Sequence, residues 1–91
     1  MRREYLLNQF AYTTAEGDVD VNQLEWTSVI AADYWLALDE GRQRARAAGL
    51  DEERVRIFHR IQAVAFTPWQ EVDEHTDWEE LINQLDPVIE I

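Results

Sequence analysis

The chain has 91 residues, a net charge of −11 and no cysteine, and 46% of its residues are hydrophobic. These values predict a single small acidic domain, residues 1–91, with a core of its own, and they exclude disulfides and thiol chemistry. The longest run without a charged residue, 5–15, is too short to cross a bilayer, and the negative charge repels nucleic-acid phosphates and anionic lipid. We therefore expect a soluble, intracellular (cytoplasmic) protein with no direct nucleic-acid binding and no membrane binding.

The N-terminal segment 4–14 carries two conflicting patterns. Its apolar residues have helical spacing, whereas its aromatic residues and the closing Thr-Thr favour a strand. A turn is expected at 15–18, and residues 19–21, Val-Asp-Val, can return as a second strand. We expect a β-hairpin here, with a helix as the alternative.

A long helix is expected over residues 28–48. Thr27 or Ser28 can cap its start, and Gly49 can end it. In its first half, apolar residues lie on every side of the helix, which is typical of a buried central helix. Trp35 is therefore expected in the core.

A second helix is expected to start at Asp51, which can act as its cap while Leu50 packs against Val55. Because only a tight turn separates it from the first helix, the two should form an antiparallel hairpin. We expect Phe58 to be buried against the first helix. The apolar arc consists of Val55, Phe58, Ile61 and Ala65, and the polar arc of Arg56, His59 and Arg60.

Two capping boxes follow, starting at Thr67 and Thr76, and predict two short helices rich in acidic residues. The second helix would carry an apolar stripe that includes Trp78. The expected fold is mainly α: an antiparallel helical hairpin plus short acidic C-terminal helices. The N-terminal β-hairpin, if it forms, makes the fold α+β.

Charge is unevenly distributed along the chain. Residues 41–60 hold six Arg and three acids, whereas residues 61–91 hold eight acids and no Lys or Arg. We call the arginines of 41–60 the Arg-rich waist: Arg42, Arg44, Arg46, Arg54, Arg56 and Arg60. Acids at helical spacing should pair locally with three of them, as Arg42–Asp39, Arg44–Glu40 and Arg56–Glu52. A homo-oligomer in which the waist meets the acidic end of a second copy also fits this pattern.

Catalytic and metal-binding patterns are weak in this sequence. Glu71 and His75 stand four residues apart, but zinc or iron needs further ligands at defined positions. The sequence has no nucleophile elbow, no phosphate-binding glycine loop and no dinucleotide fingerprint. We expect no enzyme activity, no cofactor and no metal.

The acidic segment 67–81 is the strongest candidate for a partner-binding site. We expect its carboxylates and one partly exposed Trp to occupy a basic groove of a nucleic-acid-binding protein, as an inhibitor or decoy. In composition, though in no motif, this profile is similar to that of anti-CRISPR proteins. The alternative is a structural or assembly subunit, a small chaperone or an antitoxin-like partner whose acidity serves solubility. The candidate residues are Trp69, Glu71, Asp73, Glu74, Asp77, Glu79 and Glu80.

Overall fold

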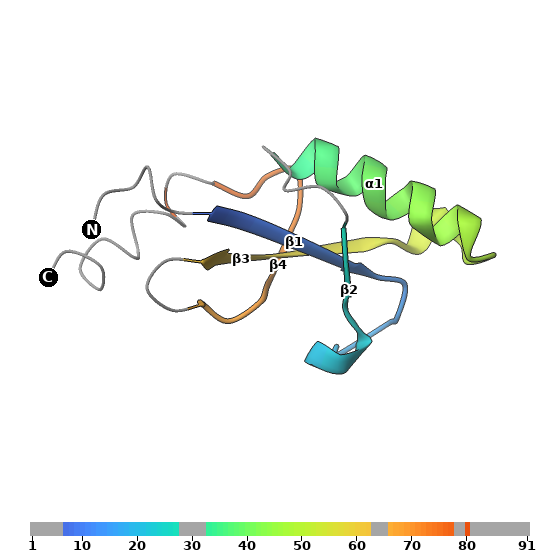
Figure 1. The fold of residues 1–91 in the computed structure, drawn as a ribbon, viewed down its shortest axis with the longest axis horizontal. Coiled ribbons are helices and arrows are strands. Elements are labelled where there is room, and N and C mark those ends of the chain that lie inside the picture. The colour runs from blue at the N-terminus through green and yellow to red at the C-terminus, as the bar shows by residue number, and fades with distance from the viewer. Residues whose placement is uncertain (1–6, 28–32, 63–65, 78–79, 81–91) are drawn as a thin grey trace, which may run out of the picture.

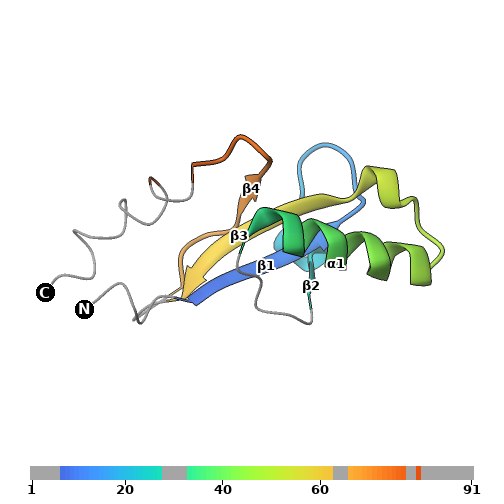
Figure 2. The same cartoon turned by 90° about the horizontal axis from the view of Figure 1, so that it is seen from above.

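The computed structural model describes residues 7–27, 33–62, 66–77 and 80. These residues form an α+β arrangement in which helix α1 lies over one face of a four-stranded antiparallel sheet (Figure 1, Figure 2). The strand order is β2-β1-β3-β4. In chain order the elements are β1 (Leu7–Thr13), the 3₁₀ turn η2 (Val21–Gln23), β2 (Glu25–Trp26), α1 (Tyr34–Ala47), the 3₁₀ turn η3 (Glu52–Arg54), β3 (Arg56–Gln62) and β4 (Gln70–Val72).

The sheet has two different faces because side chains alternate along each strand. The central strands β1 and β3 pair over their full length, from Leu7 opposite Gln62 to Thr13 opposite Arg56. Alternate residues of β1, β3 and β4 pack with α1 on what we call the helix face, and the residues between them lie on the open face. The core of the helix face consists of Phe10, Tyr12, Ile57 and Val72 with Ala37, Leu38 and Ala45.

Helix α1 packs on the sheet through small side chains. It begins after Asp33, whose Oδ1 accepts a hydrogen bond from the Leu36 amide at 3.0 Å. Its buried residues include Ala37, Gly41 and Ala45. A Cβ added to Gly41 would lie only 3.1 Å from the Tyr12 Cβ, so glycine here permits the close approach of helix and sheet.

The prediction that the helix over residues 28–48 is buried on every side is therefore wrong. The described helix has one buried side, and Trp35 is 57% exposed rather than in the core. Leu36 is exposed beside it. The proposed caps at Thr27 and Ser28 give way to Asp33; Thr27 instead donates its hydroxyl to the Phe10 carbonyl oxygen, at 3.3 Å.

The second long helix, and with it the helical hairpin and the mainly-α fold class, is wrong. Asp51 does act as a cap, since its carboxylate accepts from the Glu53 amide at 2.9 Å, but the turn it starts is η3. The chain then extends into β3 instead of continuing as a helix. Pairing with β1 on one side and β4 on the other decides this, because long-range pairing overrides a local helical pattern.

The predicted N-terminal β-hairpin is present, but a different segment forms its second strand. Strand β1 lies within the predicted 4–14 segment. Its return partner is β2, with Ala11 opposite Trp26, and not residues 19–21. Asp20 caps η2 instead, in a capping box with Gln23.

The helix predicted at Thr67 is wrong as well. The Thr67 hydroxyl accepts from the Ile61 amide at 2.8 Å, and its amide donates back to the Ile61 carbonyl at 2.9 Å. These bonds attach the chain to the end of β3 and lead it into β4. The last predicted helix, including Trp78, falls almost entirely outside the described residues; within them, the Asp77 carboxylate accepts from the Glu80 amide at 3.1 Å. No helix in the described part of the chain is long and apolar enough to cross a membrane.

Candidate binding surface on the open face of the sheet

An arginine lies among three aromatic rings on the open face. The Arg60 guanidinium carbon is 4.5 Å from the ring centre of Trp26, and 4.0 Å and 4.5 Å from those of Phe66 and Trp69. The two Trp rings meet edge to face at 5.2 Å. We call these four residues the aromatic cluster. It joins β2, β3 and the segment before β4, which are far apart in the sequence.

The guanidinium of Arg60 is held by polar contacts from the same face. Its Nε donates to Gln9 Oε1 at 2.9 Å, and Gln9 Nε2 donates to Gln62 Oε1 at 2.8 Å. Burial lowers the pKa of Arg60, which still leaves it charged at neutral pH. Among the described residues Arg60 forms no ion pair, so ring faces and an amide oxygen stabilise its charge in place of a carboxylate.

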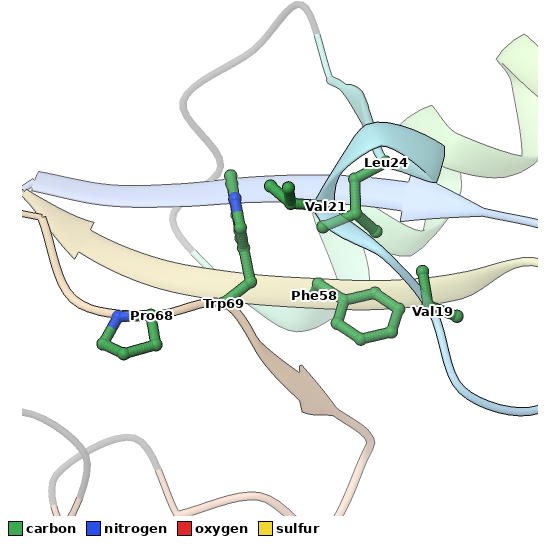
Figure 3. A pocket seen from close by; sticks show the side chains of 6 residues that line it. All are labelled: Val19, Val21, Leu24, Phe58, Pro68 and Trp69. Atoms are coloured by element: carbon green, nitrogen blue, oxygen red, sulfur yellow. The ribbon is translucent and has the colours of Figure 1, made fainter.

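A pocket of about 340 Å³ adjoins the aromatic cluster. Figure 3 shows its six side chains, with Val19 at one end and Pro68 and Trp69 at the other. Phe58 belongs to β3, and the chain around η2 and the segment before β4 form the two sides. All six lining residues have apolar or aromatic side chains: Val19, Val21, Leu24, Phe58, Pro68 and Trp69.

Arg56 ties the two sides of this pocket together. Its Nη1 donates to the carbonyl oxygens of Ala15 and Gly17 at 2.9 Å and 2.8 Å. Its Nε and Nη2 donate to the Glu71 carboxylate at 2.9 Å and 2.7 Å, a bidentate pair. These hydrogen bonds hold the pKa of Glu71 below its usual value. Arg56 thus connects the loop that leads to Val19 with strand β4.

The predicted acidic site is divided by this arrangement. Glu71 is engaged by Arg56, and Trp69 belongs to the pocket and the aromatic cluster. The Asp73 carboxylate closes a turn by accepting from the His75 amide at 2.8 Å. Glu74 is exposed, with its carboxylate 3.4 Å from His75 Nε2.

The remaining members of the predicted site follow that turn. Asp77 and Glu80 are exposed, and Asp77 accepts the hydrogen bond from the Glu80 amide. Glu79 lies outside the described residues. The exposed members therefore run along one stretch of chain after β4, apart from Trp69 and Glu71 on the open face.

The Arg-rich waist is not a continuous basic patch. Arg44 pairs with Glu40 at 3.0 Å, as its spacing predicted. The other two predicted pairs are replaced: Arg56 pairs with Glu71, and Asp39 accepts from Gln43. Within the described ranges, four arginines are ion-paired, as Arg44–Glu40, Arg46–Glu52, Arg54–Glu16 and Arg56–Glu71.

His59, expected on a wet helical surface, is buried on the helix face of the sheet at 2% exposure. Its Nε2 lies 2.9 Å from Asn8 Oδ1, and its ring centre is 5.1 Å from that of Phe10. Burial lowers the pKa of His59 to about 4, so the ring is neutral at pH 7. The helical Glu71–His75 spacing is not realised either, because Glu71 is in β4 and His75 is in the turn beyond it. Within the described ranges, no cluster of three or more His, Asp or Glu side chains is arranged to hold a metal ion.

Sequence reasoning missed Arg60, Phe58 and Phe66 as members of one surface. A partial signal was present for Arg60, since Ile57 and Ile61 fall on one side of a period-two pattern and Arg56 and Arg60 on the other, whereas Phe58 interrupts the pattern. Phe66 had no local signal, because only the bend before β4 brings it to Arg60. The open face thus offers apolar contact area, a stacked cation and a pocket, and these are features of recognition.

Comparison with protein-family models, with curated proteins and with solved structures gives no match for this chain.

Proposed function

We propose that this protein is a non-enzymatic acidic inhibitor or decoy that binds a basic, nucleic-acid-binding surface of a partner protein. The observation that carries the proposal is the pairing of the waist arginines. Four of them are neutralised by the chain's own glutamates. The acids after β4 therefore keep their field, because the sequence from residue 61 onwards contains no Lys or Arg.

Charge of this kind acts mainly on the rate of association. A surface of one sign attracts an oppositely charged partner over a distance, and salt screens that attraction. A protein of net charge −11 competes for a basic channel in the same way as a nucleic acid does, by occupying positions meant for phosphates. The proposal therefore predicts partner binding that is fast at low salt and displaces nucleic acid.

We assign this role to those acids after β4 whose carboxylates are not used to hold the fold. Glu71 is committed to Arg56, and Asp73 and Asp77 accept hydrogen bonds from nearby amides. Glu74 and Glu80 are exposed and can be changed without removing those bonds. They are the residues with which to test the proposal.

The test uses two variants of equal charge. In the first, Glu74→Lys and Glu80→Lys reverse charge beyond β4. In the second, Asp39→Lys and Glu53→Lys make the same change on exposed positions of α1 and η3. Wild type and both variants are immobilised, and proteins retained from a cell lysate at low salt are identified. The retained protein is then purified, and its association rate with each form is measured at several salt concentrations, together with displacement of a labelled duplex.

We expect the Glu74/Glu80 variant to associate about tenfold more slowly at low salt, and the control to change much less. The wild type should displace the duplex. If the Glu74/Glu80 variant associates as fast as the wild type, or if the duplex stays bound, the decoy proposal is wrong. The acidity would then serve solubility and capping, as in the structural or assembly alternative.

A further inference from the structure

We infer that the open face receives an extended segment of the basic partner, with an apolar side chain in the pocket and a Lys or Arg beside Asp18 and Asp20. This inference rests on the proposed function and specifies how the partner is held. It assigns specificity to the pocket and leaves long-range attraction to the acids after β4.

The pocket is large enough to receive an apolar side chain, and apolar and aromatic side chains line it. Its volume of about 340 Å³ is at the lower end of the range for ligand pockets, which is roughly 300–1,000 Å³. Around it lie large apolar side chains that the fold leaves in water: Trp26 is 49% exposed, Phe66 53% and Val21 57%. Contiguous exposed apolar surface of this kind marks an interaction site, and Trp and Arg are the residues most often found at its energetic centre.

The sides of the pocket are held before any partner arrives. Arg56 bonds the Ala15 and Gly17 carbonyls on one side and Glu71 on the other. Arg60 stacks against Trp69 and so supports the opposite end. A preformed pocket costs little conformational entropy on binding, which favours affinity.

The negative charge at the rim of the pocket favours a basic residue next to the apolar side chain of the partner. Asp18 and Asp20 stand on either side of Val19, which lines the pocket. Both are exposed, and neither forms an ion pair with a described residue. Arg56, which interacts electrostatically with Asp18, is already paired with Glu71. A partner Lys or Arg at this end would meet two exposed carboxylates that have no ion pair with a described residue.

Two other occupants are less compatible with these charges. Stacked bases would suit Trp26, but a nucleic acid would bring its phosphates to a protein of net charge −11. A second copy packed open face to open face would bring two Arg60 cations together. Both alternatives are distinguishable outcomes of the experiment below.

The experiment titrates the full chain with short synthetic peptides and follows Trp fluorescence, because Trp69 lines the pocket. The first peptide has one central Leu flanked by arginines. In the second, Ser replaces the Leu; in the third, Glu replaces the arginines. We expect the first peptide to bind at least about tenfold more tightly than either of the others.

Two protein variants locate the binding. Val21→Arg fills the rim of the pocket with a cation, and Leu36→Arg makes the same change at an equally exposed apolar position on α1. We expect Val21→Arg to weaken binding of the Leu peptide about tenfold and Leu36→Arg to change it less than about twofold. Circular dichroism confirms that both variants are folded.

The outcomes separate this inference from the proposed function. If the Leu and Ser peptides bind equally and the Glu74/Glu80 reversal weakens both, the acidic role stands and the pocket has no anchor, so the inference is wrong. If the arginine and glutamate peptides bind equally, the basic partner itself is wrong. Binding of a single-stranded oligonucleotide in preference to the peptides, or concentration-dependent dimerisation lost in Val21→Arg, would assign the face to one of the two other occupants.

Discussion

The two faces of the sheet use the same strands for opposite purposes. On the helix face, Phe10 and Ile57 are almost fully buried under α1, and the imidazole of His59 is held neutral. On the open face, Arg60 keeps its charge while packed against three rings, two of which are half exposed. The helix face is therefore a core, and the open face is a surface with the composition of an interface.

Strand β3 shows how one segment serves both faces. Ile57, His59 and Ile61 alternate with Arg56, Phe58 and Arg60, so each neighbour along the strand enters a different environment. His59 and Arg60 are neighbours in the chain, yet both lose contact with water in different ways. His59 is buried as a neutral ring, whereas Arg60 keeps its charge and packs against aromatic rings. The position of α1 therefore decides which side of β3 becomes core.

The largest expected effect separates the two phenylalanines. Phe10→Ala removes a ring that is 2% exposed beneath α1, and should lower the free energy of unfolding by about 3–5 kcal/mol. Phe58 is buried as expected, at 8% exposure, but on the face opposite the helix and beside the pocket, so Phe58→Ala should cost less, about 3 kcal/mol. Denaturant unfolding measures both. An equal loss for the two would show that the open face is as closely packed as the helix face.

The second expected effect is a pH dependence that belongs to the helix face. The pKa of His59 falls from 6.5 to about 4 on folding, so between these values the unfolded chain binds a proton that the folded chain does not. Stability is therefore full above pH 6.5 and declines as the pH falls, by roughly 2 kcal/mol at pH 5 relative to pH 7.

Denaturant unfolding at pH 7 and pH 5 checks this effect, with His59→Gln as the control. The control should lose this part of the pH dependence. Because the pKa of Glu71 is held below its usual value, the stability it contributes is lost at more acidic pH and does not explain a change above pH 5. A wild-type stability that is unchanged from pH 7 to pH 5 would place His59 in contact with water.

The smallest effect concerns the open face. Arg60→Ala removes the cation from the aromatic cluster and should destabilise the protein by about 1 kcal/mol, since the stacked rings remain partly exposed. Trp fluorescence should shift to longer wavelength as Trp26 and Trp69 gain contact with water. The matched control, Arg44→Ala, breaks a surface pair with Glu40 and should cost about 0.3–0.5 kcal/mol without a fluorescence change. Identical behaviour of the two variants would reduce Arg60 to an ordinary surface arginine.

Local features were predictable from the sequence where the chain's own neighbours decide them. Asp51 was recognised as a cap and Gly49 as the residue after a helix, where its φ of 77° requires glycine. The strand character of β1 and the Arg44–Glu40 pair were also read correctly. Each depends on residues within a few positions of one another, so the physical cause is contained in the local sequence.

The main error came from a segment whose local signals disagree. Residues 50–62 begin with a cap and apolar residues at helical spacing, yet they also hold β-branched residues and a period of two. A strand is stable only when it pairs with other strands. Of the two partners of β3, β1 is far away in the sequence and β4 is only three residues long. The local sequence favours a helix in this segment. The seven positions paired with β1 stabilise the strand instead.

The candidate site divides in the same way. The exposed acids Glu74, Asp77 and Glu80 were identified from composition, because a carboxylate in a polar stretch needs no partner to stay in water. The pocket, the stacking of Arg60 and the Arg56–Glu71 clamp were not identified. They depend on how residues 66–69 and the loop before β2 lie against β3, which no short-range pattern encodes.

The sequence by itself determined the charge of this protein, the absence of thiol chemistry, the existence of α1 and the strand nature of its N-terminal segment. These follow from composition or from interactions between near neighbours. Only the tertiary structure decided that residues 56–62 are a strand, that His59 is buried and neutral, and that Trp26, Phe66 and Trp69 surround Arg60. The physical reason is that burial and pairing are properties of distant segments brought together, and the free energy of those long-range contacts exceeds the small local preference that favoured a helix.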